Sequence, residues 1–156
     1  MTIADKINTA LLATAVLGIA LTFWQVRRSA RTRRVQFLKE LYLMLTADPD
    51  ICSAYYQIEY GKFHYGVDFH ESEIESKIDR LLAFADLVAE LYLQSQISEK
   101  EMVFFRYRFL RIYQDQGIQE YLNFLSTFYK EVGVGKEPYH SFQKVAQSFE
   151  SQHLSP

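Results

Sequence analysis

Residues 7–26, INTALLATAVLGIALTFWQV, contain no charged side chain. A helix rises about 1.5 Å per residue, so a segment of this length covers about 30 Å, the thickness of the hydrocarbon core of a bilayer. Leu, Ile, Val and Ala occupy every side of such a helix, whereas a surface helix of a soluble domain keeps one polar face. The sequence therefore predicts a transmembrane helix over residues 7–26, preceded by a short polar N-terminus over residues 1–6.

A basic neck follows this segment, because residues 27–34 contain five arginines. Positive charge stays on the cytoplasmic side of a membrane helix, so we expect the N-terminus outside and the rest of the chain in the cytoplasm, at the inner (plasma) membrane. A cleaved signal peptide would carry its positive charge before the apolar core. The arginines would attract anionic lipid headgroups, and a tryptophan suits the headgroup region. The residues expected to contact the membrane surface are Trp24, Arg27, Arg28, Arg31, Arg33 and Arg34.

Small residues recur at every fourth position of the predicted membrane helix. Such a ridge lets two membrane helices approach closely, which indicates self-association or docking on another helix. Chance is the alternative, because the segment is rich in Ala and Thr. The candidate packing face consists of Ala10, Thr14, Gly18 and Thr22.

The chain from residue 35 onward is acidic, with 11 Lys and Arg against 18 Asp and Glu, a net charge near −7. Nucleic-acid binding depends on basic surface, so we expect no nucleic-acid partner. The single cysteine, Cys52, excludes an intramolecular disulfide and a paired-cysteine zinc site, and its apolar neighbours favour a buried side chain.

Helix start and stop signals divide this acidic region. Gly and Pro together make up 9 of 156 residues, which favours long helices. Asp48-Pro49 is typical of a helix start, and Ser72 with Glu75 and Ser98 with Glu101 have the spacing of capping boxes. The first helix is expected to run without a break from the neck to about residue 46. The others are expected at about residues 49–60, 73–94, 99–115, 118–132 and 138–150. The sequence thus predicts an all-α fold: a transmembrane helix, then one bundle of about five to six helices over residues 35–150, with a tail over 151–156.

Few residues in this region suggest chemistry. His70 precedes three alternating glutamates, whose simplest role is to cap a helix N-terminus; a metal or catalytic site there is the alternative. Motifs for nucleophilic catalysis, phosphate loops or dinucleotide binding are absent from the sequence. We therefore predict no catalytic residue, cofactor or metal.

Charged and aromatic residues of the body suggest contacts instead. Arg108 and Arg111 share one helix face, and Asp115 is in reach of Arg111. This face is either a site for an anion or an acidic partner, or a solvated face with ion pairs. Asp86 lies in an apolar run and is expected to pair with an arginine across the bundle. Tyrosines cluster between residues 55 and 65, which favours an interface or core packing with solvated hydroxyls. The candidate interaction surface consists of Tyr56, Tyr60, Tyr65, Arg108 and Arg111.

Three segments of the chain are VQFLKELYLMLTADPD, which follows the neck, IDRLLAFADLVAELYLQSQIS and IQEYLNFL. With these segments the chain resembles a family of short bacterial proteins that have an N-terminal membrane anchor and an all-helical domain of unknown function. The resemblance implies a single-pass membrane protein and assigns no catalytic residue. The leading hypothesis is a cytoplasmic module that binds or scaffolds a protein partner, with self-association as one form. A membrane-associated enzyme and an anionic-lipid sensor are the alternatives.

Overall fold

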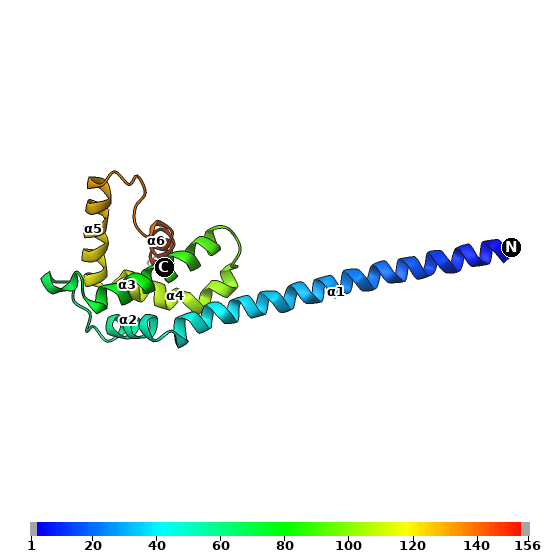
Figure 1. Cartoon of the computed structure of the whole chain (residues 1–156), viewed down its shortest axis with the longest axis horizontal. Coiled ribbons are helices and arrows are strands. Elements are labelled where there is room, and N and C mark those ends of the chain that lie inside the picture. Colours follow the sequence, from blue (N-terminus) through cyan, green and yellow to red (C-terminus); the bar gives the residue numbers. More distant parts are fainter. Residues whose placement is uncertain (1–2, 154–156) are drawn as a thin grey trace. The chain divides into compact units, whose positions relative to one another are not determined.

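The structure is a computed structural model that describes residues 3–153, with side chains described from residue 18 onward except at 20, 31 and 153. Six α-helices and one 3-10 turn make up its elements, and no strand occurs between residues 3 and 153 (Figure 1). The all-α prediction is confirmed. The elements are α1 (Ile3–Ala47), α2 (Pro49–Glu59), η1 (Val67–Phe69), α3 (Glu73–Leu93), α4 (Glu99–Tyr113), α5 (Gln116–Glu131) and α6 (His140–His153).

The chain divides into two compact units, Met1–Tyr42 and Leu43–Pro156. The first unit consists of α1 up to residue 42, and the helix is unbroken at the arginine-rich neck. No helix in the described part of the chain is both long and apolar enough to cross a membrane. Of the candidate packing face, Ala10 and Thr14 lie outside the residues whose side chains are described, and so does Arg31 of the neck.

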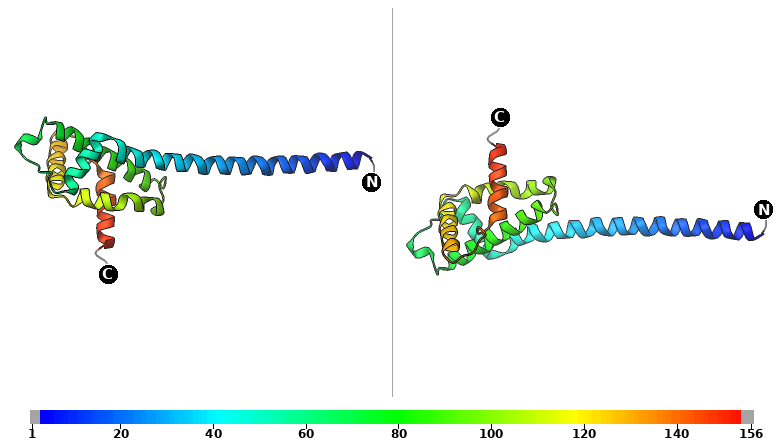
Figure 2. Two further views of the ribbon diagram at one scale, coloured as in Figure 1. Left: turned by 90° about the horizontal axis from the view of Figure 1, so that it is seen from below. Right: turned by 90° about the horizontal axis from the view of Figure 1, so that it is seen from above.

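The second unit is a helical bundle built around α3, which packs against α2, α4 and α6. Figures 1 and 2 show α6 crossing α3 and α4, while α5 turns away from the bundle after its first turns. Phe109 of α4 and Phe142 of α6 are both buried and meet edge to face, with ring centroids 5.3 Å apart. The fully buried residues of α3 that form the rest of this core include Ile78, Leu81, Leu82 and Val88.

Most helix starts follow the predicted signals. Asp48 accepts hydrogen bonds from Asp50 N at 3.0 Å and Ile51 N at 3.1 Å, which fixes the start of α2. At α4, the Glu101 side chain reaches back to Ser98 N at 2.8 Å, as a capping box requires.

The predicted capping box at α3 is half formed. Ser72 Oγ accepts from Glu75 N at 3.2 Å, but the Glu75 side chain passes Ser72 and accepts from Glu71 N at 2.6 Å. Glu71 has a φ of 64°, the left-handed conformation that lets its N–H face the helix. The return bond therefore stabilises the turn before α3 instead of the cap residue itself.

The predicted pairing of Asp86 with an arginine is wrong. Asp86 Oδ1 accepts a hydrogen bond from Phe142 N at 2.9 Å, and Glu90, one turn further along α3, accepts from Ser141 Oγ. Both carboxylates therefore hold the N-terminus of α6, where backbone N–H groups lack partners within the helix. This contact accounts for α6 starting at His140, two residues after the predicted Pro138.

Candidate functional site

The packed helices α2 and α4 each carry exposed aromatic residues, which we together call the α2–α4 aromatic surface. Tyr56 and Tyr60, one turn apart on α2, stack with ring centroids 5.6 Å apart and an interplanar angle of 15°, and are 47% and 65% exposed. On α4, Phe104 and Tyr107 lie one turn apart and are 68% and 62% exposed. The surface comprises Tyr56, Tyr60, Val103, Phe104 and Tyr107.

Glu59 joins the two helices beneath this surface. Its carboxylate accepts hydrogen bonds from Tyr107 at 2.8 Å and from Tyr55 at 3.0 Å. Burial, and then the hydrogen bond to Glu59, raises the pKa of Tyr55, and the same carboxylate raises the pKa of Tyr107. Both phenols therefore stay neutral and act as donors, which fixes α2 against α4.

The two predicted surface arginines support α2. Arg111 donates to the carbonyl oxygens of Ile58 at 3.0 Å and Glu59 at 3.3 Å, which lie in the last turn of α2, where carbonyl groups lack helical partners. The guanidinium of Arg108 lies 5.5 Å from the centre of the Tyr55 ring. Arg111 therefore contacts α2 instead of the predicted Asp115, and both arginines brace the aromatic surface.

Tyr65 lies apart from Tyr56 and Tyr60, so the predicted tyrosine cluster is split. Tyr65 Oη lies 2.9 Å from His70 Nε2, and His70 Nδ1 lies 2.9 Å from Glu75 Oε1. The His70 ring packs on Phe124 of α5, with centroids 4.4 Å apart. Within the described residues no group of three or more His, Cys, Asp and Glu side chains could hold a metal ion. Glu75 instead bonds the turn before α3, in agreement with the predicted role at a helix N-terminus.

A second tyrosine network has no counterpart in the sequence predictions. Tyr121 of α5 and Tyr139, just before α6, both donate to Asp79 Oδ1 of α3, at 2.8 Å and 3.1 Å. Burial raises the pKa of both tyrosines, and the nearby Asp79 carboxylate raises it further. These partners lie 42 and 60 positions from Asp79 in the chain, so no local pattern could have revealed them.

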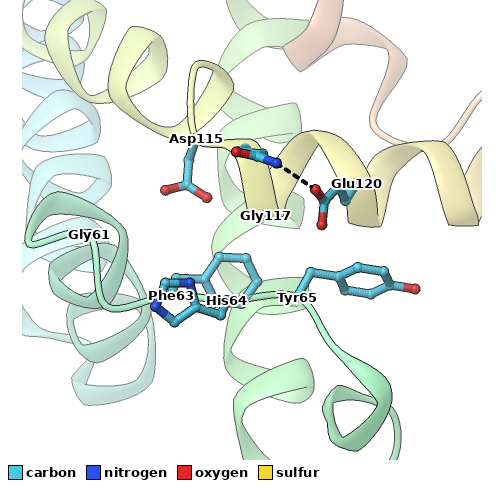
Figure 3. Close-up of a pocket in the computed structure, with 8 residues that line it drawn as sticks. Gly61, Phe63, His64, Tyr65, Asp115, Gly117 and Glu120 are labelled. Carbon is cyan, nitrogen blue, oxygen red and sulfur yellow. Dashed lines mark hydrogen bonds between the residues drawn. The ribbon is translucent and has the colours of Figure 1, made fainter.

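A pocket of about 290 Å³ lies between the loop after α2 and the first turns of α5 (Figure 3). The loop contributes Phe63, His64 and Tyr65, and the carboxylates of Asp115 and Glu120 point toward it from the other side.

Gly117 sets the spacing of this pocket. A Cβ atom at this position would lie 2.9 Å from two ring carbons of Phe63 and 3.2 Å from Tyr65 N. The missing side chain therefore lets the loop approach the start of α5.

The N-terminal unit carries aromatic and arginine pairs. The Arg27 guanidinium lies 5.8 Å from the centre of the Phe23 ring, and that of Arg28 lies 5.4 Å from the Trp24 ring. Trp24 is 58% exposed. The predicted membrane-surface residues Trp24, Arg27 and Arg28 thus form exposed pairs along one segment of α1.

The other predicted residues of this unit are exposed as well. Arg33 and Arg34 of the neck are exposed, as are Gly18 and Thr22, the described half of the candidate packing face. The Thr22 hydroxyl donates to the Gly18 carbonyl at 2.8 Å, so its hydrogen bond is satisfied within the helix.

No family model, curated protein or solved structure matches the chain.

Proposed function

We propose that the chain is a single-pass membrane protein whose helical unit binds a protein partner through the α2–α4 aromatic surface. The observation that carries this proposal is the grouping of five exposed apolar or aromatic side chains over two helices. Large apolar patches on a soluble unit mark sites of interaction, and tyrosines are favoured where a surface is wet when free and dry when bound. The surface is also braced by Glu59 and Arg111, so little ordering is needed on binding.

The partner that this surface fits presents an apolar face, against which the exposed aromatic rings would be buried.

A photocrosslinking experiment tests the site. A photoreactive amino acid replaces Tyr60 in the full-length protein in its native membranes, and in a matched control it replaces Gln147, which is exposed on α6. We expect a discrete crosslinked product from position 60 only, and its loss when Phe104→Ser is added. The same products from both positions, or persistence after Phe104→Ser, would rule out the aromatic surface as the binding site.

We also propose that residues 7–26 anchor the chain, with the N-terminus outside and the helical unit in the cytoplasm. The uncharged segment and the five arginines after it support this orientation. In a Cys52→Ser background, Thr2→Cys should react with a membrane-impermeant maleimide in intact cells, whereas Gln147→Cys should react only after permeabilisation. Labelling of Gln147→Cys in intact cells would exclude this topology.

The arginine and aromatic pairs favour a second candidate function, recognition of anionic lipid. Arg27 and Arg28 lie over aromatic rings that suit the headgroup region, so their guanidinium groups would meet lipid phosphates there. Each basic residue near an anionic surface contributes about 1 kcal/mol. Replacing all five neck arginines by glutamine should therefore abolish any preference of the full chain for phosphatidylserine vesicles over neutral ones. An unchanged preference would exclude lipid recognition by the neck.

A further inference from the structure

The pocket between the loop after α2 and the start of α5 is negatively charged. Two carboxylates, Asp115 and Glu120, line it, and no lysine or arginine is among the described residues that line it. The start of α5 contributes a partial positive charge of about half a unit, which two full negative charges outweigh. The pocket therefore attracts a cation.

Asp115 supplies an acceptor that the fold leaves open. The residue is nine-tenths buried, with 9% of its surface exposed, and its Oδ1 atom accepts from Ile118 N at 3.1 Å. No hydrogen bond or ion pair engages Oδ2 within the described residues. Every fully buried polar side-chain atom of the described residues has a hydrogen-bond partner. Oδ2 has none, so it is accessible to solvent, and Figure 3 shows the carboxylate pointing toward the pocket.

The opposite wall suits the organic part of a cation. Phe63 and Tyr65 line the pocket from the loop, and aromatic faces attract cations as well as alkyl groups. A volume of about 290 Å³ lies at the lower end of the range for ligand pockets.

We propose that this pocket binds the ammonium group of a small primary alkylamine. The ammonium N–H groups donate to Asp115 Oδ2 and to the Glu120 carboxylate, which also accepts from Gln116 Nε2 at 2.9 Å. The alkyl chain lies along the aromatic wall. This site is separate from the α2–α4 aromatic surface, so it goes beyond the function proposed above.

Ligand-observed NMR on the full-length protein in detergent, with n-butylammonium as the probe, tests the site. We expect saturable binding that Asp115→Asn and Glu120→Gln each weaken about tenfold, about 1.4 kcal/mol. Asparagine keeps an oxygen that can cap α5, so Asp115→Asn removes the charge and leaves the helix start intact. The matched control is Glu131→Gln, the same loss of charge at the exposed C-terminal end of α5, which should leave binding unchanged.

Two further probes identify the chemistry that is recognised. 1-Butanol has the same chain length without the charge, and tetramethylammonium has the charge without N–H donors; both should bind at least about tenfold more weakly than n-butylammonium. Equal binding of 1-butanol would show that the pocket recognises only the apolar chain, and equal binding of tetramethylammonium would exclude recognition of the N–H groups. Absence of saturable n-butylammonium binding, or equal effects of Glu131→Gln and Glu120→Gln, would overturn the proposal.

Discussion

Replacing Asp86 should loosen α6, because this carboxylate holds the start of that helix from across the bundle. Asp86 Oδ1 lies 2.9 Å from Phe142 N. Loss of a side-chain cap costs about 0.5–2 kcal/mol, and loss of a negative charge at a helix N-terminus costs a further 0.3–1 kcal/mol or so. Asp86→Ala should therefore destabilise the unit Leu43–Pro156 by about 2 kcal/mol.

Asp86→Asn separates the cap from the charge. The amide oxygen can still accept from Phe142 N, so only the charge effect is lost, at about 0.5–1 kcal/mol. For a unit of this size 1 kcal/mol shifts Tm by about 4 °C, so we expect decreases near 8 °C for Asp86→Ala and 2–4 °C for Asp86→Asn.

Thermal unfolding of the full-length protein, followed by near-ultraviolet circular dichroism, measures both shifts in Tm. The signal reports on the second unit, because most aromatic residues lie there. Asp68→Ala removes the same atoms from an exposed position and should change stability by less than about 0.5 kcal/mol. If Asp86→Asn cost as much as Asp86→Ala, or if neither cost more than Asp68→Ala, Asp86 would not act as a cap for α6.

Three other substitutions test separate parts of the fold by denaturant unfolding. Gly117→Ala should lower the free energy of unfolding by about 1–2 kcal/mol, because overpacking against the buried Phe63 ring outweighs the gain in helix propensity. The control Gly135→Ala should leave stability nearly unchanged, because a Cβ atom there meets nothing within 4 Å. Tyr121→Phe should cost about 1.5 kcal/mol at pH 7. Because folding raises the pKa of Tyr121, its contribution is complete below about pH 10 and is lost as the pH rises further, so Tyr121→Phe should also reduce the alkaline loss of stability. Arg111→Leu should cost about 1–2 kcal/mol by removing the donor to the last carbonyls of α2, and an unchanged midpoint would exclude this role.

The helix boundaries could be predicted where the signal is local. Asp48 before Pro49, and Ser98 with Glu101, satisfy backbone groups within four positions of themselves, so their spacing in the sequence is enough to locate α2 and α4. Ile97, the residue before the cap of α4, is buried, as in a hydrophobic staple.

The partners of polar side chains in the bundle could not be predicted in the same way. Asp86 lies in an apolar run, which indicates burial, but its partner is a backbone N–H group 56 positions away, and a backbone group leaves no mark in the sequence. The arginines of α4 therefore favour the prediction of an arginine partner instead. Tyr65 is close to Tyr56 and Tyr60 in the chain, which predicts one cluster, yet the loop after α2 carries Tyr65 to His70 and α5.

The carboxylate side chains of the second unit have different roles. Glu59 is engaged by two phenols, Asp79 by two others, and Asp86 by a helix start, so these charges stabilise the fold and offer little to an external partner. Asp115 differs, because one of its oxygens caps α5 while the other faces a pocket that Glu120 also lines. Net charge alone therefore overstates the acidic surface that a partner would meet. It is the placement of Asp115 and Glu120 opposite an aromatic wall that makes a cation-binding pocket the specific expectation for this unit.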